Sequence, residues 1–436
     1  MARWSWQHGF FRLLAAVVIV LLGSPGVPPA AGQATLLLPI GVIYARDPNA
    51  PASTRQAAME TAAQRLNRYF QSLGSPLRVQ LVLRETGRDR ERTLAAVREL
   101  YDQGIRVFIG PETSAEVQAV DQLPFAREIV VISYASTAPS LMAQAVSLFR
   151  VVPNDTNQAQ ALATLLWEDG IRAIVPVWRD DIYGRDLARE LRARFTAFGG
   201  SVADGILYPT TTTEFGPVMR VVGQQVGQHV ALWGKEAVAV VLIAIDETPA
   251  LLRAAAATPL LDTVWWYGTD GTALNLGVLR DPVAAAFAWQ TAFTASLYGE
   301  EVYTQEALDL GEAIRQQTGM APEAYAYTAY DAVMVAGLTA ERAGGVNNAA
   351  RFAAALPEVA NGYFGVTGPM VLDRRGDRAF GTYEFWAVRA EGDELFWVDV
   401  AHVEILPDQA PYTDRFLPHR RPRLPIALPL PLPLGR

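Results

Sequence analysis

From Leu36 onward, short apolar runs alternate along the chain with longer segments whose apolar residues recur at helical spacing. The apolar runs are rich in Val and Ile without strict alternation, which is typical of strands buried on both faces. One helical segment begins at Ser53 or Thr54, which can cap it, and ends at Gly74. Because strands and helices alternate at this spacing, the pattern predicts a parallel, doubly wound sheet. The first strands are expected at 36–44, 77–84, 105–110 and 128–133.

The same rhythm restarts near residues 151–154 and continues to residue 268. We therefore expect two α/β units of similar size, and 436 residues, half of them hydrophobic, are enough for two domains. After Trp289 the pattern is mainly helical, over 306–356, and it then turns to β. The strands of the second unit are expected at 171–178, 236–245 and 263–268.

The composition excludes several kinds of chemistry. The chain has no cysteine, which excludes disulfides, thiolate metal sites and cysteine nucleophiles. Its four histidines are scattered without metal-ligand spacing, and the motifs GxSxG and GxGxxG do not occur. We therefore expect no catalytic residues, no metal and no cofactor, and predict that the protein is not an enzyme. A net charge of −8 without a basic cluster in the folded part also argues against a nucleic-acid partner.

The N-terminus has the layout of a secretory signal, predicted over residues 1–32. Arg3 and Arg12 precede an apolar stretch, 13–22, and the small residues Ala30-Ala31-Gly32 offer a cleavage site. The apolar stretch is shorter than the ~20 residues of a membrane span, so cleavage is favoured over a retained N-terminal anchor. The mature protein is then expected outside the cytoplasm, secreted or periplasmic.

The C-terminus differs in kind from the rest. Residues 407–436 end in alternating Leu and Pro, which cannot form a helix or a central strand. We predict an extended Pro-rich tail. A disordered end is the plain interpretation, and a strap across the protein or a contact with an anionic surface is the alternative.

Small polar groups follow two of the predicted strands of the first unit. In open α/β sheets, ligands bind beyond the carboxyl ends of the strands. The strand that ends at Ser133 is followed by Ser136 and Thr137, and the preceding strand leads into a helix start at Ser114. The free N–H groups of a helix start suit an anion such as a carboxylate.

The second unit adds two residues of the same type of position. Tyr183 and Asp270 each follow a predicted strand. Hydroxyls, N–H groups, one ring and one carboxylate together indicate a site for a zwitterion. Each residue also has a plain structural role, because Ser114 can be an N-cap, and Tyr183 and Asp270 can belong to ordinary turns.

Seven segments, taken in order, resemble the type I periplasmic binding proteins, specifically the leucine/isoleucine/valine-binding family of ABC importers. The resemblance runs from Pro39 to about Leu406, and it rests on the order and spacing of the segments rather than on any one of them. The segments are FIGPETSAEVQ, ISYASTAPSL, FRVVPND, WRDDIYGRDLA, YGTDGTAL, YAYTAYDAV and GVTGPMVLDRRGD.

The resemblance implies a fold of two doubly wound parallel-sheet lobes that are joined by a three-strand hinge, with a ligand cleft between them. Lobe 1 would comprise 36–152 and 291–368. Lobe 2 would comprise 153–290 and 369–406.

The resemblance also implies roles for individual residues. The ligand's carboxylate would meet Ser114 and Thr137, within a floor that includes Ser136. Its ammonium would meet the carbonyl of Ala135 and the carboxylate of Asp270, and Tyr183 would close from the second lobe.

Two departures from the family's pattern bear on the ligand. Asp270 stands where the family usually has Glu, and Asp246 follows a strand after which the family often has an aromatic residue. If Asp246 reaches the cleft, the ligand is more polar or cationic than leucine. Asp246 therefore joins the predicted ligand-binding residues.

The predicted function is capture of an amino acid, branched-chain or related, and its delivery to an ABC permease in the membrane. A monomer is expected. The alternative keeps the fold and changes the role, to a sensor of amides, urea or another small metabolite.

Overall fold

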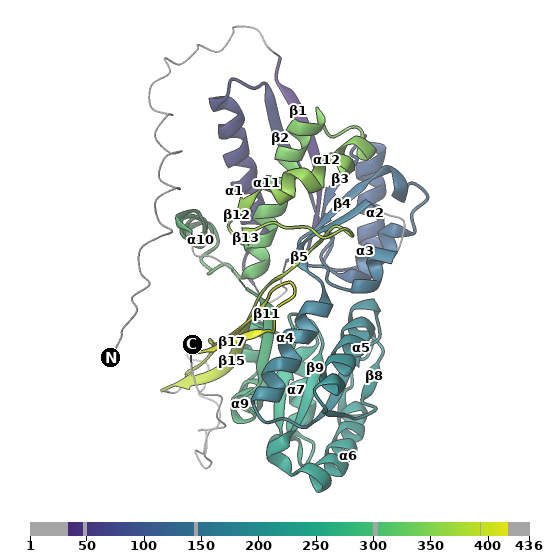
Figure 1. Cartoon of the computed structure of the whole chain (residues 1–436), viewed down its shortest axis with the longest axis vertical. Helices are drawn as coiled ribbons and strands as arrows, with labels where there is room; N and C mark the ends of the chain where they lie inside the picture. The colour runs from purple at the N-terminus through teal and green to yellow at the C-terminus, as the bar shows by residue number, and fades with distance from the viewer. Residues whose placement is uncertain (1–33, 47–49, 144–146, 300–303, 393, 417–436) are drawn as a thin grey trace, which may run out of the picture.

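The computed structural model describes residues 34–46, 50–143, 147–299, 304–392 and 394–416. The predicted signal segment 1–32 and the Leu-Pro part of the tail lie outside these ranges. The described chain forms two lobes, one above the other in Figure 1, and each is built around its own sheet. The predicted fold class is confirmed by this architecture.

Lobe 1 contains a six-stranded sheet in the order β14-β5-β4-β3-β1-β2, with all neighbouring strands parallel. The central strands bury Val and Ile on both faces, as in β3 and β4, where every residue is buried. The strand bounds are β1 Leu36–Tyr44, β2 Leu77–Glu85, β3 Val107–Ile109, β4 Val130–Ser133, β5 Ser147–Pro153 and β14 Asp377–Arg378.

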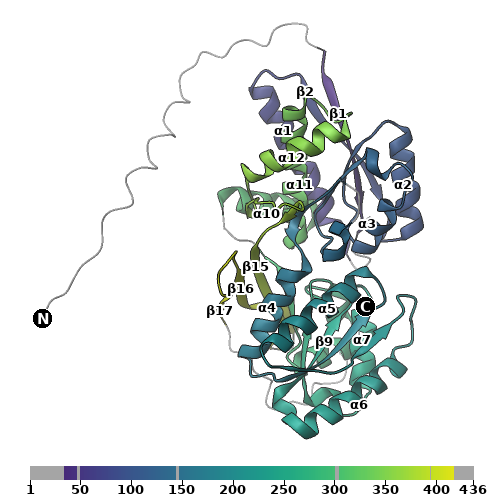
Figure 2. The same cartoon turned by 45° about the vertical axis from the view of Figure 1, so that its right-hand side comes forward.

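Helices cover both faces of this sheet, as Figure 2 shows. One face packs against α1 (Thr54–Ser72), α10 (Gln305–Thr318), α11 (Ala324–Ala343) and α12 (Ala349–Asn361). The other face packs against α2 (Arg90–Asp102) and α3 (Ser114–Asp121). A two-stranded ladder, β12 (Phe364–Gly365) with β13 (Gly368–Pro369), follows α12.

Lobe 2 contains a nine-stranded sheet in which a parallel part is extended by three antiparallel strands. The parallel strands are β6 Ala173–Arg179, β7 Ser201–Val202, β8 Ile206–Tyr208, β9 Val238–Ile243, β10 Trp265–Gly268 and β11 Thr294–Tyr298. The antiparallel strands are β15 Gly381–Glu391, β16 Glu394–Ile405 and β17 Tyr412–Arg415.

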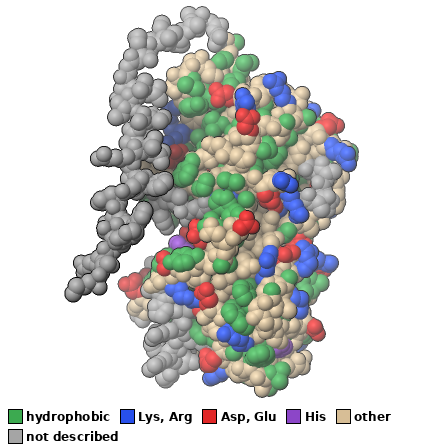
Figure 3. All heavy atoms as spheres, viewed as in Figure 1, with side chains coloured by type: hydrophobic (Ala, Val, Ile, Leu, Met, Phe, Trp, Pro, Cys, Tyr) green, Lys and Arg blue, Asp and Glu red, His purple; other side chains and the backbone are tan. Residues whose placement is uncertain are grey.

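The helices of lobe 2 also lie on both faces of its sheet. α4 (Asp155–Glu168) and α5 (Ile182–Ala197) pack on one face. The other face packs against α6 (Gly216–Trp233), α7 (Thr248–Ala256), α8 (Leu276–Arg280) and α9 (Pro282–Gln290). On the face drawn in Figure 3, acidic and basic side chains are interspersed over both lobes.

The chain passes between the lobes three times, but two boundaries differ from those predicted. β11 pairs with β10 and β15, so residues 294–298 belong to lobe 2, although lobe 1 was expected from residue 291. β14 pairs with β5, so residues 377–378 belong to the sheet of lobe 1, although lobe 2 was expected from residue 369. Hydrophobic patterning marks strands but does not say which sheet a strand joins.

The predicted tail also begins too early. β17 pairs with β16 over residues 412–415, so part of the segment 407–436 is the edge strand of lobe 2. The Leu-Pro pattern starts after this strand. Across the described ranges, we find no helix with the length and apolar character that spanning a bilayer requires.

A buried ion pair ties together two of the crossing segments. Arg150 on β5 and Asp377 on β14 are buried, and Nη2 of Arg150 lies 2.8 Å from Oδ2 of Asp377. The amide of Asn154 donates to the same Oδ2 at 2.7 Å. Asn154 also caps α4, the first helix of lobe 2, so this pair fixes the point where the chain leaves lobe 1.

Candidate functional site

A cavity of about 620 Å³ lies between the two lobes. It is bordered by the segments that follow β1, β3, β4, β6, β9 and β10 and by the start of α11. Six of the seven predicted ligand-binding residues line it: Ser114, Ala135, Thr137, Tyr183, Asp246 and Asp270. The rule that ligands bind at the carboxyl ends of parallel strands therefore located this cavity from the sequence.

The seventh residue, Ser136, lies behind the cavity wall. Its hydroxyl is buried and lies 3.2 Å from the hydroxyl of Ser114. The Ser114 oxygen in turn accepts hydrogen bonds from the amides of Thr137 (3.2 Å) and Ala138 (3.1 Å). Ser136 thus supports the loop after β4, and Ser114 joins this loop to the start of α3.

Arg150 also stabilises the loop after β4, by hydrogen bonds to two of its carbonyl groups. Its Nη1 donates to the carbonyl of Ala138 at 2.9 Å and to that of Ser136 at 3.4 Å. The loop is therefore fixed by a guanidinium that is itself paired with Asp377. The sequence offered no sign of this support, because Arg150 and Asp377 are 227 residues apart.

The start of α3 is capped by the residue that precedes Ser114. Thr113 is the N-cap, and it forms a capping box with Glu116. Ser114, the first residue of the helix, is therefore not the cap, and this alternative reading of Ser114 does not hold. The first-turn amides of a helix have no intrahelical acceptor, so this end of α3 presents N–H groups beside the hydroxyl of Ser114.

Lobe 2 presents a carboxylate held by hydroxyl groups. Oδ1 of Asp270 accepts a hydrogen bond from Tyr183 at 2.6 Å, and the Tyr183 hydroxyl also lies 2.8 Å from that of Thr269. Burial, together with the nearby charge of Asp270, raises the pKa of Tyr183 well above its usual value, so this hydroxyl stays protonated. A Cβ at Gly271 would lie 2.2 Å from the carbonyl oxygen of Ala244, so the turn that presents Asp270 requires glycine.

Tyr325, which sequence reasoning missed, reaches Asp270 from the other lobe. It lies at the start of α11 in lobe 1, and its hydroxyl donates to Oδ2 of Asp270 at 2.6 Å. Both oxygens of Asp270 therefore accept a tyrosine hydroxyl, one from each lobe. The segment that carries Tyr325 contains three tyrosines, and its sequence alone does not say which of them faces the cleft.

Asp155 was also missed, and it is the least compensated charge near the site. It is the first residue of α4 and is fully buried, and no cation pairs with it among the described residues. Neither carboxylate oxygen makes a short hydrogen bond there, although the Thr137 side chain is near enough to favour the ionised form. Its amide donates to the carbonyl of Thr137 at 2.9 Å, which places it directly beside the ligand-facing loop. Burial, followed by repulsion from Asp270, raises the pKa of Asp155 well above its usual value.

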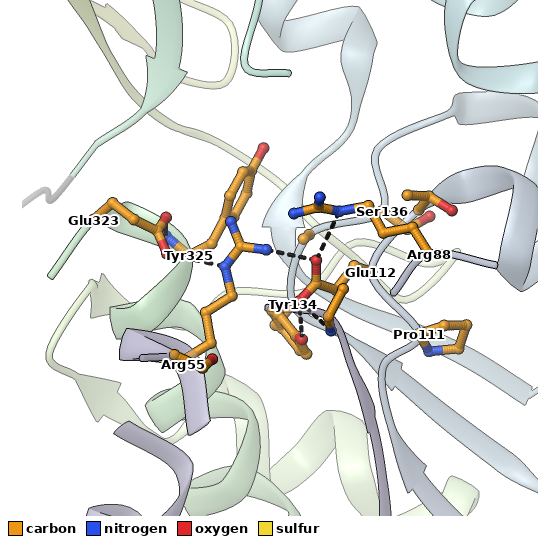
Figure 4. Close-up of polar contacts among 12 residues, drawn as sticks. Arg55, Arg88, Pro111, Glu112, Tyr134, Ser136, Glu323 and Tyr325 are labelled. Carbon is orange, nitrogen blue, oxygen red and sulfur yellow. Dashed lines mark hydrogen bonds and ion pairs between the residues drawn. The ribbon is translucent and has the colours of Figure 1, made fainter. Parts of the chain in front are cut away.

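The wall of the cavity on lobe 1 carries a cluster of charges, shown in Figure 4. Glu112 is buried and accepts from Arg55 (2.5 Å) and Arg88 (3.2 Å), and Arg55 also pairs with Glu323 at 3.0 Å. Burial alone would raise the pKa of Glu112, but the two guanidiniums outweigh it and lower that pKa. Arg88 continues across the cleft to Asp246, which is therefore occupied by a protein partner.

The rest of the wall is mainly apolar and aromatic. Such a surface accommodates a hydrocarbon or aromatic side chain through the hydrophobic effect. The residues concerned are Leu274, Leu297, Met320, Pro322, Trp386 and Trp397.

One group of side chains near the cavity has the composition of a metal site. Ligand atoms of Glu384, Asp399 and His402 lie within 4.8 Å of one another. Each of the three side chains also has a protein partner, since Nε2 of His402 lies 2.6 Å from Oδ2 of Asp399 and Trp386 donates to Oε2 of Glu384 at 2.9 Å. Burial would lower the pKa of His402, but the hydrogen bond to Asp399 outweighs it and raises that pKa, as in an ordinary ion pair.

The arrangement can hold a small molecule between the lobes. The cavity offers hydroxyl and N–H groups on lobe 1, at Ser114, Thr137 and the start of α3, and these face the half-buried carboxylate of Asp270.

Comparison with known proteins agrees with this geometry. A family model described as the receptor family ligand binding region matches residues 54–391. The uncharacterized protein MJ1266 of Methanocaldococcus jannaschii is 30% identical over 361 residues, which are 78% of this chain and 83% of that protein.

Two solved structures illustrate the fold. The leucine binding protein LivK of Thermotoga maritima is similar with a TM-score of 0.65 and 20% identity, over 83% of this chain and 97% of LivK. An ABC-transporter solute-binding protein of R. palustris, in complex with 4-hydroxybenzoate, is similar with a TM-score of 0.67 and 16% identity, over 85% of this chain and 98% of that one. The architecture is that of type I periplasmic binding proteins, as the resemblance in the sequence implied.

Proposed function

This chain belongs to the family described as the receptor family ligand binding region, and from that premise we propose that it is an extracytoplasmic solute-binding protein for an α-amino acid. The ligand would lie in the cavity between the lobes.

The pairing of opposite recognition groups supports an amino acid headgroup. On one side lie Ser114, Thr137 and the start of α3, which offer hydroxyl and N–H donors to a carboxylate. Across the cavity lies the half-buried carboxylate of Asp270, and the fully buried Asp155 lies beside Thr137, behind the residues that line the cavity. Neither carboxylate has an ion-pair partner among the described residues. A buried charge is expensive without a counter-charge, so a ligand ammonium is the group that this arrangement lacks.

The single observation that carries the proposal is the state of Asp155. A fully buried carboxylate without an ion-pair partner in the described chain, beside the loop that holds Thr137, destabilises the empty protein. Such a residue is explained when a cation binds next to it. Ala135 borders the cavity, and its carbonyl would accept a further ammonium hydrogen.

The apolar wall supports a hydrocarbon side chain on this amino acid, branched-chain or related. Arg55 and Arg88 are each paired with carboxylates, so they do not offer a free site for a second acidic group. An acidic amino acid would have to displace one of these pairs. Leucine is accordingly the first ligand to test.

The proposed partner is a membrane permease of an ABC importer, to which the closed protein would deliver its ligand. We propose that the protein acts as a monomer outside the cytoplasm and does not transform the ligand chemically. The alternative role, sensing of amides, urea or another small metabolite, would use the same cavity without an ammonium group opposite Asp155 and Asp270.

A ligand panel tests the proposal. Isothermal titration calorimetry with leucine, isoleucine, phenylalanine, 4-hydroxybenzoate, acetamide and urea should give saturable binding of at least one amino acid and none of the last two. Native mass spectrometry of protein from its own host should then show a mass increment equal to an intact amino acid. Binding of an amide or urea with no amino acid binding would overturn the proposed ligand class.

A further inference from the structure

Arg88 and Asp246 face each other across the cleft from different lobes. Arg88 follows β2 of lobe 1, and Asp246 follows β9 of lobe 2. Nη1 of Arg88 lies 3.0 Å from Oδ1 and 2.9 Å from Oδ2 of Asp246. Both side chains line the cavity. We propose that this ion pair is a clasp that favours the closed cleft and slows release of the ligand.

The Arg88 side of the clasp is held in place by lobe 1 alone. Its Nε donates to Glu112 at 3.2 Å, and Glu112 also accepts from Tyr134 (2.8 Å) and from the amide of Ala45 (3.1 Å). Figure 4 shows Arg88 and Arg55 converging on the same carboxylate. The guanidinium is thus directed toward the cleft before the lobes meet.

The backbone at Arg88 has an unusual conformation that fits this role. Arg88 has a φ of 60° and follows Gly87, which has a φ of 64°. A residue with a side chain is uncommon in this left-handed region, and strain of this kind concentrates at ligand clamps and switch regions. The loop accepts the strain while its arginine points into the cavity.

Asp246 can separate from Arg88 and become fully solvated when the lobes open. Its side chain is 51% exposed, whereas that of Arg88 is 15% exposed, and in the described chain its only cationic partner is Arg88. When the lobes separate, Asp246 returns to water and Arg88 keeps Glu112. Opening therefore leaves no buried charge without a partner, which distinguishes this pair from a permanent tie such as Arg150–Asp377.

The exposure of Asp246 also sets the size of the effect. Exposed ion pairs typically contribute ~0.2–1 kcal/mol, which corresponds to about a 1.4- to 5-fold change in an equilibrium constant. A contribution of this size biases a lobe equilibrium without locking it. Because salt screens exposed charges, the clasp should weaken as ionic strength rises.

The absence of cysteine allows a direct measurement of closure. Ala95 on α2 of lobe 1 and Gln224 on α6 of lobe 2 are exposed and can each be replaced by cysteine for spin labelling. The distance distribution between the two labels, measured by electron paramagnetic resonance without ligand, reports the closed fraction. The variant is Asp246→Asn, which keeps the shape of the side chain and removes its charge.

Asp262→Asn is the matched control. Asp262 is an exposed acid of lobe 2 that precedes β10, at the edge of the sheet opposite the cleft, so the change in net charge is the same. At low salt, Asp246→Asn should shift the distribution toward longer distances, and Asp262→Asn should not. High salt should shift the wild type toward the Asp246→Asn distribution and leave that variant unchanged.

Leucine release supplies the second readout, which rests on the proposed function. In stopped-flow displacement, Asp246→Asn should release leucine about 1.4- to 5-fold faster than the wild type and the control. If leucine does not bind the wild type, the proposed ligand is wrong, and the distances without ligand still decide whether the clasp exists. Identical distributions for wild type and Asp246→Asn at low salt would overturn the clasp.

Discussion

The hydroxyl of Tyr325, on lobe 1, donates a 2.6 Å hydrogen bond to Oδ2 of Asp270, on lobe 2. The other oxygen of Asp270 accepts from Tyr183 of its own lobe at the same distance. Opening of the cleft must therefore break the Tyr325 bond while the Tyr183 bond can persist. Asp270 is thus a point where the two lobes meet in the cavity, beside the position proposed for the ligand's ammonium.

This relationship predicts that Tyr325→Phe weakens ligand binding without damaging either lobe. A hydrogen bond to a charged group contributes about 1.5–3 kcal/mol, so leucine affinity should fall by roughly 10- to 100-fold. Isothermal titration calorimetry measures this, and small-angle scattering with saturating leucine should still show closure. Tyr412→Phe, at an exposed tyrosine of β17, is the control and should bind like wild type. Equal affinities of the two variants would show that Tyr325 has no part in the bound state.

Asp270 should be more sensitive than Thr137. Removing one partner of a buried ion pair costs about 3–5 kcal/mol, whereas Thr137→Ala loses one hydrogen bond to a charged group, about 1.5–3 kcal/mol. Asp270→Ala should therefore reduce leucine affinity more than Thr137→Ala, with Asp270→Asn between them. Calorimetry on the three variants, each first shown to be folded by its melting curve, checks the order. Binding by Asp270→Ala within a few-fold of wild type would mean that Asp155 alone holds the ammonium.

Much of the site was predictable because a local rule places it. Residues that follow the carboxyl ends of parallel strands converge on one edge of a sheet, and this rule is enough to bring Ser114, Thr137, Tyr183 and Asp270 together. The same rule applies to Asp155, which comes two residues after β5. The rule therefore also predicts Asp155 at this edge, although Asp155 is not among the ligand-binding residues predicted from the sequence.

Other features depend on contacts between distant parts of the chain, and no local pattern encodes them. The pairings of Arg150 with Asp377 and of Arg88 with Asp246 join residues 227 and 158 positions apart. β11 likewise belongs to lobe 2 because it pairs with β10 and β15, and its own sequence does not reveal these partners. Asp246 was expected to face the ligand, and only the structure shows that an arginine of the other lobe occupies its carboxylate.

The Arg150–Asp377 pair predicts a strong and non-additive effect on stability. Arg150→Met leaves Asp377 buried and without its cation, which should lower the free energy of unfolding by about 3–5 kcal/mol. The double variant Arg150→Met with Asp377→Leu removes both charges and should be less destabilised than Arg150→Met alone. Denaturant unfolding measures both, and a double variant at least as unstable as the single one would contradict the reasoning.

The binding effect of the same variants separates two roles of Arg150. Its guanidinium also holds the carbonyls of Ser136 and Ala138, and neither variant keeps these bonds. Leucine affinity should therefore fall in the double variant even where stability recovers. Recovery of both properties together would show that the loop does not need Arg150.

Asp155 predicts a conflict between stability and binding that depends on pH. Its pKa is raised by burial and then by Asp270, with Asp186 acting in the same direction, while the Thr137 side chain and Arg150 act against this rise. An acid with a raised folded-state pKa is neutral in both states below about pH 4, so its cost is absent there. As pH rises from about 4 toward the raised pKa, the unfolded state ionises first and the empty protein loses stability.

Asp155→Asn should therefore stabilise the empty protein at pH 7, by about 1–3 kcal/mol, and flatten its stability above pH 4. The opposite holds for binding, because a ligand ammonium favours the ionised form of Asp155. In the wild type, leucine should bind more tightly as pH rises through this range and should release protons, seen as a binding enthalpy that depends on the ionisation enthalpy of the buffer. Asp155→Asn should bind leucine more weakly at pH 7 and lose most of this proton release, while Asp262→Asn behaves as wild type. A variant that is stabilised but binds leucine with unchanged affinity and proton release would show that the ammonium does not lie beside Asp155.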